Sequence, residues 1–257
     1  MARGISLVLS NCTDPARHDE FNRWYTHTHL GDLKAAPGLV GARRFVSLNA
    51  EPAAVQYLAI YEFESDDLAA SRAALGKLAG EAAASGRNID CLEIKARYAY
   101  SEMDAGAHRP LEKVDYPAWP LHPPRAEAPF NPPARTLPRG ISYVLTDCTD
   151  SSREDEFNSW YFHTHLPDLS ARPDQVKATR YRNDQTERKP ATYLALYEWL
   201  GDDVQKTAAR GMQSIKHIFE HRHIDCLKFV GNMMFQEIDA AAYEPLEKVD
   251  YPARQSH

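Results

Sequence analysis

The stretch DEFNRWYTHTHL, residues 19–30, returns almost unchanged as DEFNSWYFHTHL at residues 155–166. The match extends outward from this stretch, because residues 4–36 and 140–172 are identical at 22 of 33 positions. A solenoid needs at least about three repeats. Two copies therefore indicate a duplicated domain.

A proline-rich segment separates the two copies. Residues 117–138 contain eight prolines, which exclude a helix or a central strand and predict an extended spacer. The segment LEKVDYPA closes each copy, at residues 111–118 and 246–253. We expect each tail to lie as a strap across the opposite half, where Tyr116 or Tyr251 could reach a cavity. The chain thus divides into a first repeat with its tail (1–116), a linker (117–138) and a second repeat with its tail (139–257).

Hydrophobic periodicity predicts the order of elements within each copy. Alternating apolar residues indicate strands, Asp14 and Asp66 are typical helix N-caps, and Pro37 and Gly86 end the two helices. The resulting order, strand-helix-strand-strand-helix-strand, predicts an α+β fold of two ferredoxin-like repeats. The open faces of the two sheets should pack together as an intramolecular dimeric α+β barrel. The expected elements of the first copy are strands 4–12, 40–48, 55–64 and 89–100 and helices 14–35 and 66–84.

Composition narrows the class of protein. The 257 residues are 43% hydrophobic and 26% charged, as in ordinary soluble globular proteins. A net charge of -6 without basic runs does not favour nucleic-acid binding, and no apolar run is long enough for a membrane helix. Four cysteines without a CxxC pair exclude a disulfide scaffold and favour the cytoplasm. We expect a small-molecule substrate as partner, a pseudo-dimer within one chain and, as an open alternative, a further homodimer.

One motif resembles a known family. The pattern NxWYxxxHLxD over residues 22–32, followed by PG at 37–38 and ARRF at 42–45, resembles the EthD-like branch of the dimeric α+β barrel superfamily. The second copy repeats the pattern over residues 158–168 and departs from it at Asp174, where the glycine is missing. This resemblance implies the fold. For activity it implies a range: cyclases, isomerases, lyases, cofactor-free monooxygenases, haem enzymes and proteins of unknown role.

Catalytic candidates lie on the first helix of each copy. Phe21, Tyr25 and His29 are spaced by four and form one inward-facing stripe. Asp32, one turn from His29, could orient the imidazole as a general base near neutral pH. The alternative is a structural histidine at the helix end, with Asp32 bonded locally. The catalytic candidates are His29, Asp32 and Tyr25 in the first copy and His165, Asp168 and Tyr161 in the second.

The predicted sheet supplies candidates for substrate binding. Arg44 and Glu62 stand among apolar residues on adjacent strands, and the pair recurs as Arg180 and Glu198. Because a buried charge needs a partner, we favour an ion pair, with an arginine that binds a substrate carboxylate or enolate as the alternative. Neighbouring tyrosines could fill the core or line a pocket for a flat aromatic substrate. The binding candidates are Asn22, Trp24, Arg44, Tyr57 and Tyr61, and Asn158, Trp160, Arg180, Tyr193 and Tyr197.

We expect neither a metal nor a cofactor. His27 and His29 point in different directions if the segment is helical, and the pair His217 and His221 is not part of the repeat. No phosphate-binding loop, dinucleotide fingerprint or nucleophile elbow is present. The four cysteines fall on predicted strands, where buried thiols are the norm.

These patterns predict a cofactor-independent enzyme that uses histidine and tyrosine as acid and base. Its substrate would be a small hydrophobic compound, aromatic or polyketide-like, and its chemistry of the lyase, isomerase or cyclase type, as in aromatic compound catabolism. One alternative is a cofactor-free or haem-dependent oxygenase of the same fold. Another is a ligand-binding module without catalysis.

Overall fold

The computed structural model describes residues 1–49, 54–111, 137–170, 172, 174–185, 187 and 189–245, except for the side chains of residues 214 and 217–219. The chain forms two compact units. Unit 1 comprises Met1–Ser101 and Glu237–His257, and unit 2 comprises Glu102–Gln236. The linker at 117–136 and the tail residues Tyr116 and Tyr251 lie outside the described residues.

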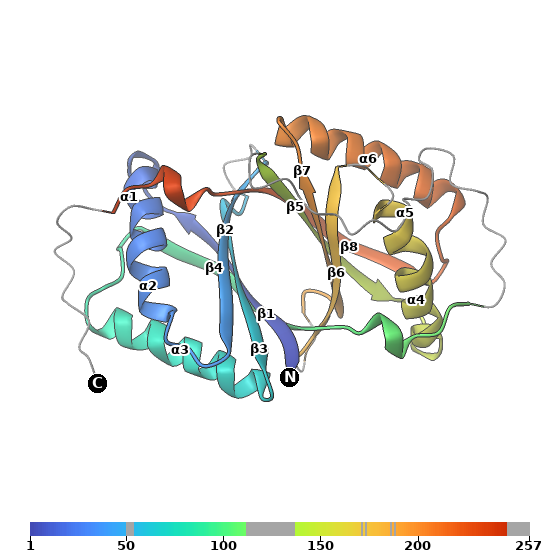
Figure 1. Cartoon of the computed structure of the whole chain (residues 1–257), viewed down its shortest axis with the longest axis horizontal. Coiled ribbons are helices and arrows are strands. Elements are labelled where there is room, and N and C mark those ends of the chain that lie inside the picture. The colour runs from blue at the N-terminus through green and yellow to red at the C-terminus, as the bar shows by residue number, and fades with distance from the viewer. Residues whose placement is uncertain are drawn as a thin grey trace. The chain divides into compact units, whose positions relative to one another are not determined.

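Unit 1 has a four-stranded antiparallel sheet in the order β2-β3-β1-β4. Its helices lie along one face of this sheet, as Figure 1 shows. The predicted element order and the α+β class are confirmed, whereas the packing of one sheet against the other stays a prediction. The elements are β1 (Ala2–Cys12), α1 (His18–Arg23), α2 (Leu30–Leu33), β2 (Leu39–Ser47), β3 (Tyr57–Ser65), α3 (Leu68–Ala84) and β4 (Leu92–Glu102).

Unit 2 repeats this arrangement with the strand order β6-β7-β5-β8. The same irregularity recurs in both first strands, between Leu9 and Ser10 in β1 and between Leu145 and Thr146 in β5. The elements of unit 2 are β5 (Arg139–Cys148), α4 (Glu154–Trp160), α5 (Leu166–Ser170), β6 (Gln175–Asn183), β7 (Tyr193–Leu200), α6 (Val204–His221) and β8 (Leu227–Glu237).

Short polar contacts fix where the helices begin and end. The Asp14 carboxylate accepts from the backbone N–H of Ala16, and Asp67 caps α3 in the same way. Gly38 has a φ of 75° in the turn before β2, a conformation that favours glycine. In unit 2 this place belongs to Asp174, whose carboxylate pairs with Arg172 at 2.9 Å.

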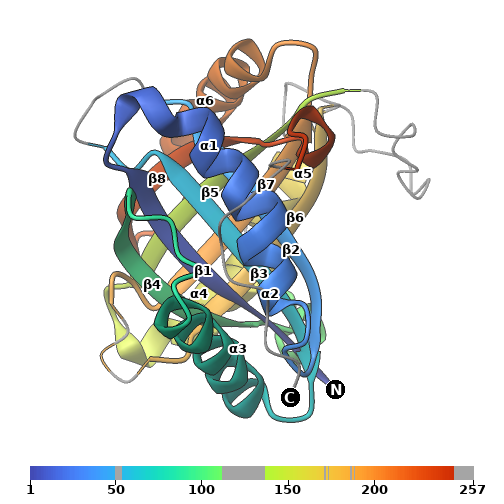
Figure 2. The same cartoon turned by 90° about the vertical axis from the view of Figure 1, so that its left-hand side faces the viewer.

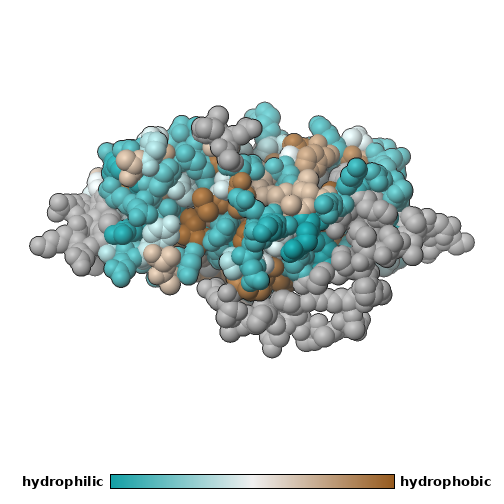
Figure 3. Space-filling view, turned by 90° about the horizontal axis from the view of Figure 1, so that it is seen from above, coloured by the Kyte–Doolittle hydropathy of each residue, from teal (hydrophilic) through white to brown (hydrophobic). Residues whose placement is uncertain are grey.

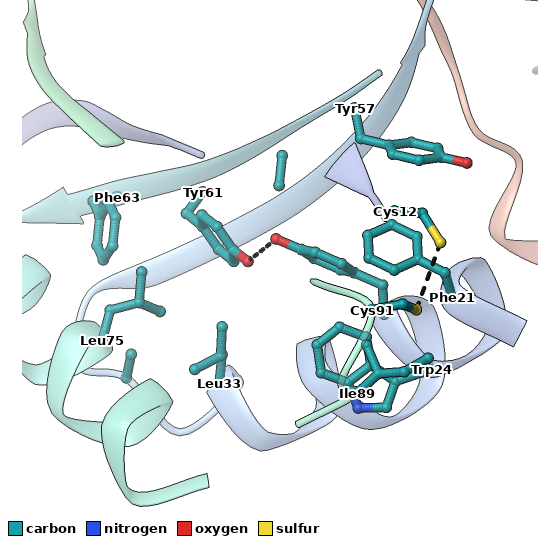
Figure 4. Close-up of a cluster of buried hydrophobic side chains, with 13 residues drawn as sticks. Cys12, Phe21, Trp24, Leu33, Tyr57, Tyr61, Phe63, Leu75, Ile89 and Cys91 are labelled. Atoms are coloured by element: carbon teal, nitrogen blue, oxygen red, sulfur yellow. Dashed lines mark hydrogen bonds between the residues drawn. The ribbon is translucent and has the colours of Figure 1, made fainter. Parts of the chain in front are cut away.

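The core of each unit lies between the first helix and the sheet. In unit 1, Figure 4 shows Phe21 and Trp24 from the helix in one buried cluster with Tyr57, Tyr61 and Phe63 from β3. These aromatic residues are almost completely buried. Burial of large aromatic side chains supplies much of the apolar area that holds a domain together. The helical segment that carries the repeated motif is therefore a core element as well as a candidate site.

The tail that follows each repeat belongs to the other unit. In unit 1, the backbone N–H of Ile238 donates to the carbonyl of Arg44 at 2.8 Å. In unit 2, the N–H of Met103 donates to the carbonyl of Arg180 at 2.9 Å. Figure 2 shows the later tail, in red, beside α1. The segments that lead into the two tails are thus part of the opposite unit, whereas residues 112–118 and 246–253, for which the straps were expected, lie outside the described residues.

The surface carries few large apolar side chains. The face shown in Figure 3 is mostly hydrophilic, with hydrophobic residues in a few patches. Among the described residues, no helix is both long and apolar enough to cross a membrane.

Because the tail of each repeat is part of the other unit, we predict that cutting the linker leaves the two halves associated. Cleavage within residues 117–138 should not separate them, because Ile238 and Met103 would still be hydrogen-bonded within the opposite unit. Size-exclusion chromatography with light scattering after cleavage at an inserted protease site checks this. A second cut, between residues 101 and 102, is the control, since it severs the first tail from its own repeat and leaves Met103 covalently attached to unit 2. Two halves that elute separately as folded monomers after the linker cut contradict the prediction.

Candidate functional site

The first helix of each unit contains a π-helical turn over the repeated motif. It spans Trp24–His29 in unit 1 and Tyr161–His165 in unit 2. At its end, the N–H of Leu30 donates to the carbonyl of Tyr25, five residues earlier. The sequence predicted one continuous α-helix, and this is wrong because each wider turn adds a residue. Such turns are frequent at functional sites, where they redirect side chains.

The wider turn packs the motif histidine against two aromatic rings. The centre of the His29 ring lies 5.0 Å from that of Trp24 and 4.7 Å from that of Tyr25. His165 lies 4.9 Å from Trp160, nearly parallel to it, and 4.8 Å from Tyr161. The Nδ1 atom of each histidine is buried and has no hydrogen-bond partner among the described residues.

Burial keeps both histidines neutral. Burial lowers the pKa of His29 to about 4. The pKa of His165 is lowered to about 3, mainly by burial and in addition by the nearby cation of Arg180. A neutral imidazole with a free Nδ1 could act as a base. A histidine whose pKa lies this far below 7 is, however, a weak base. The catalytic role of His29 and His165 stays a prediction.

The aspartates do not orient these histidines, contrary to the sequence-based expectation. Both oxygens of Asp32 bind the guanidinium of Arg87, at 2.8 and 2.9 Å. Asp168 binds Arg222 in the same bidentate way, at 2.6 and 3.0 Å. The Trp24 indole N–H also donates to the carbonyl of Arg87. Asp32 and Asp168 thus connect the first helical segment of each unit to an arginine that follows the second helix, Arg87 after α3 in unit 1 and Arg222 after α6 in unit 2.

The buried arginines lie against tyrosine faces and not beside the expected glutamates. The guanidinium carbon of Arg44 is 4.1 Å from the centre of the Tyr25 ring, and that of Arg180 is 3.5 Å from the centre of Tyr161. Glu62 pairs instead with Arg43, at 2.9 Å. In the described part of the chain no carboxylate forms an ion pair with Arg44 or Arg180.

In unit 2 the expected partner of Arg180 is also taken. Glu198 pairs with Arg139 at 2.6 Å. Arg180 is only 1% exposed, and one of its N–H groups donates to the Asn158 side chain at 3.0 Å. Its Nε and Nη1 atoms have no partner among the described residues. The expected ion pairs are therefore wrong, and both arginines keep hydrogen-bonding capacity.

Two tyrosines join the helix to the sheet in each unit. The hydroxyls of Tyr25 and Tyr61 are 3.0 Å apart, and Tyr197 donates to Tyr161 at 3.1 Å. Burial raises the pKa of Tyr25 and of Tyr61, so both phenols stay protonated. These residues lie in a closed cluster, which Figure 4 shows for unit 1.

The sequence missed a histidine at the open edge of this cluster. His18, the first residue of α1, has its Nδ1 atom 2.7 Å from the hydroxyl of Tyr57. Asn22 contacts the same hydroxyl at 3.4 Å and that of Tyr243 at the same distance. His18 and Tyr57 line a cavity of about 300 Å³. The remaining lining residues are Val46, Ser47, Asn49, Ala54, Val55 and Gln56.

Unit 2 differs at this edge. Glu154 occupies the place of His18 and accepts a hydrogen bond from Tyr193 at 2.6 Å. Arg182 lies 3.6 Å from the same carboxylate. Burial and this hydrogen bond raise the pKa of Tyr193 to about 12. A comparison of positions 18 and 154 within the repeat was the one signal in the sequence that could have revealed this difference.

A metal site is not apparent in the described part of the chain. No group of three or more His, Cys, Asp or Glu side chains there could hold an ion. His27 binds the carbonyl of Tyr243, and His163 binds that of His108 at 2.6 Å. These two histidines anchor the tails within their units.

Solved structures with a similar fold cover nearly the whole chain. The sequence matches no family model, and no curated protein matches it. A double mutant of chlorite dismutase from Candidatus Nitrospira defluvii has a TM-score of 0.54 at 9% identity, over 94% of this chain and 93% of its own. A single mutant of the same enzyme has a TM-score of 0.52 at 10% identity, with the same coverage. This chain shares its ferredoxin-like α+β fold with these structures.

A dye-decolorizing peroxidase from Bacteroides thetaiotaomicron has a TM-score of 0.50 at 7% identity, over 93% of this chain and 94% of its own. At these identities the likeness concerns the fold alone. The activity of the chain therefore has to be argued from its own residues.

The neutral histidines predict a loss of stability in acid. Their pKa is lower in the folded chain than the ordinary value of 6.5, so the unfolded chain takes up protons first as the pH falls. The stabilisation is complete above pH 6.5 and is lost progressively toward pH 4. As the pH falls through this range, protonation of each histidine in the unfolded chain should lower the free energy of unfolding by about 1.4 kcal/mol per pH unit. Urea denaturation of wild type and of His165→Gln checks this, and equal pH slopes for the two would contradict it.

Proposed function

We propose that unit 1 carries a cofactor-free acid–base site for a small, partly apolar compound, with His18 and Tyr57 as the reacting pair. The observation that carries this proposal is the 2.7 Å contact between His18 Nδ1 and the Tyr57 hydroxyl at the wall of a cavity of about 300 Å³. The cavity is open to solvent on one side, and its volume is at the lower end of those that hold small ligands.

The groups around Tyr57 support a proton relay. Burial raises the pKa of Tyr57, so the free protein holds it as a phenol, which can donate to His18 Nδ1 when the imidazole proton is on Nε2. A substrate C–H proton would pass to the Tyr57 oxygen while the phenol proton passes to His18 Nδ1. The Asn22 amide, 3.4 Å from the hydroxyl, stabilises the charge that develops on this oxygen.

Arg44 provides the positive charge behind the relay. Its guanidinium carbon lies 5.5 Å from the centre of the Tyr57 ring, and it counteracts the rise in the Tyr57 pKa. Proton removal next to a carbonyl or phenol produces an enolate-like anion, which a nearby buried cation favours. This supports an isomerase- or lyase-type reaction on a carbonyl or phenolic compound. The apolar part of such a compound would contact Val46 and Val55.

The repeat supports two further proposals about origin. The shared strand order, the shared irregularity of the first strand and the paired π-helical turns support a tandem duplication. The motif at residues 22–32 supports membership of the EthD-like branch. A pseudo-dimer of the two repeats in the cytoplasm fits these proposals.

A haem-dependent enzyme is the second candidate, and the fold comparisons favour it. Chlorite dismutases and dye-decolorizing peroxidases are haem-dependent enzymes of this fold. A haem site needs an axial ligand such as histidine and a distal pocket with donors. His165 and Arg180 would be the candidates in unit 2, because both lie against the ring of Tyr161.

The packing between these two residues does not fit a haem. The Tyr161 ring fills the gap, with its centre 4.8 Å from that of His165 and 3.5 Å from the Arg180 guanidinium carbon. Tyr161 is 1% exposed, and the neighbouring cavity beside Tyr197 has a volume of about 20 Å³, room for about one water. The residues of this chain therefore support the cofactor-free proposal.

Exchange of substrate hydrogen with solvent tests the acid–base proposal without knowledge of the natural substrate. Incubation in D₂O with a panel of small ketones, 1,3-dicarbonyl compounds and phenols should give deuterium incorporation by NMR. Tyr57→Phe should slow it by about 10²–10⁴-fold, as expected for loss of a general acid–base group. Tyr193→Phe is the matched control in unit 2 and should leave the rate within about twofold.

The melting temperatures of both variants separate loss of chemistry from loss of fold. An equal loss of exchange in the two variants contradicts the assignment to unit 1. Exchange that survives in Tyr57→Phe but disappears in His29→Asn would restore the helix histidine as the base.

Absorption spectroscopy tests the haem candidate. Protein produced with added haem precursor and purified should show no stoichiometric Soret band, because Tyr161 fills the space between His165 and Arg180. Tyr161→Gly should bind added hemin more tightly than wild type does, since it opens this space. A stoichiometric Soret band in wild type that disappears in His165→Ala would establish the haem candidate.

A further inference from the structure

Unit 1 holds two cysteines whose sulfur atoms meet. Cys12 ends β1, Cys91 immediately precedes β4, and their Sγ atoms lie 3.5 Å apart, as the dashed line in Figure 4 shows. Both are free thiols. The backbone around them is held by Thr13, whose N–H donates to the carbonyl of Cys91 at 2.9 Å. The two strand ends are thus fixed with their thiols in contact.

Unit 2 repeats this arrangement with Cys148 and Cys226. Cys148 ends β5 and Cys226 immediately precedes β8, and the N–H of Thr149 donates to the carbonyl of Cys226 at 2.8 Å. The strand register is also the same, because Cys12 is opposite Leu92 and Cys148 is opposite Leu227. The repeated scaffold therefore places two cysteines at paired strand ends in each unit.

The two pairs differ in their access to solvent. Cys12 and Cys91 are each 3% exposed, and Cys226 is 2% exposed. Cys148 is partly exposed, and its thiol donates to the carbonyl of Asp150 at the surface. A dissolved oxidant can therefore reach Cys148 directly, whereas the pair in unit 1 becomes accessible only when that unit opens.

We propose that Cys148 and Cys226 form a redox-responsive dithiol that hydroperoxides convert to a disulfide, with Cys12 and Cys91 as its shielded counterpart. The inference is independent of the acid–base site.

The chemistry takes place in two steps. The Cys148 thiolate attacks hydrogen peroxide, the O–O bond breaks, and Cys148 sulfenic acid and hydroxide form. The Cys226 thiol then displaces the sulfenic oxygen, which leaves as water as the S–S bond forms. Overall two thiols and one peroxide give one disulfide and two waters, so two electrons pass from sulfur to oxygen.

The fold favours the second step. Cys148 and Cys226 hold the register positions at which the sulfurs of Cys12 and Cys91 lie 3.5 Å apart. From such positions side-chain rotation can bring two sulfurs to the disulfide length of about 2.0 Å. The resulting bond would join the end of β5 to the start of β8. Burial raises the pKa of Cys226 to about 12, which suits a residue that does not react first and only resolves the sulfenic acid.

Oxidation of the full chain with graded hydrogen peroxide tests this proposal. After quenching with N-ethylmaleimide, peptide mapping by mass spectrometry should show the 148–226 disulfide forming at least about tenfold faster than the 12–91 disulfide. The melting temperature should rise by about 5 °C or more on oxidation, since the bond restrains the unfolded chain. This readout needs no variant and no substrate.

Two variants identify the roles of the sulfurs. Cys226→Ser should leave Cys148 as a sulfenic acid that dimedone labels, whereas Cys148→Ser should leave Cys226 unmodified. Cys12→Ser is the matched control in unit 1 and should not change the rate at which the 148–226 bond forms. Three results would overturn the proposal: sulfinic acid at Cys148 without a disulfide, faster closure of the 12–91 pair, or resistance of both folded pairs to peroxide.

Discussion

A buried guanidinium against the face of a tyrosine is the interaction around which each unit is built. Arg44 stacks on Tyr25 and Arg180 on Tyr161, and neither has a carboxylate partner among the described residues. An unpaired buried cation is costly, so several aromatic faces must compensate for lost hydration. The arginine lies on the second strand and its main tyrosine on the first helix. The interaction therefore fixes how the helix sits on the sheet, and the neighbouring aromatic residues follow.

The exchanged tails depend on the same strand. The carbonyl of Arg44 accepts from Ile238 and that of Arg180 from Met103, so each tail is bonded to the residue that carries the buried cation. Tyr243, farther along one tail, contacts Asn22, which also contacts Tyr57. A segment distant in sequence thus completes the edge of the unit 1 site. Each repeat alone lacks the residues that finish its own unit.

The repeat made the element order and the core aromatic residues predictable, but side-chain partners depended on strand register. Arg44 and Glu62 had been placed on one apolar face, yet Arg44 stands opposite Ala59 and so shares a face with the tyrosines. Arg43, one residue away, points to the other face of the sheet and forms an ion pair with Glu62. Because side chains alternate along a strand, a shift of one residue exchanges the partners. The π-helical turn was unpredictable for a similar reason, since four-residue spacing presumes an α-helix.

The difference between the units is chemical and lies at one position. The scaffold holds a tyrosine hydroxyl beside the first residue of α1 or α4 in both copies, at Tyr57 and Tyr193. A histidine at this place offers the phenol a ring nitrogen that can donate or accept a proton, whereas the carboxylate of Glu154 accepts the hydrogen bond of Tyr193 and raises the pKa of this phenol. Glu154 also attracts Arg182, where unit 1 has the cavity-lining Val46. The two units thus share the buried arginine on a tyrosine face, whereas the edge beside Tyr57 carries a histidine and the edge beside Tyr193 carries an ion pair.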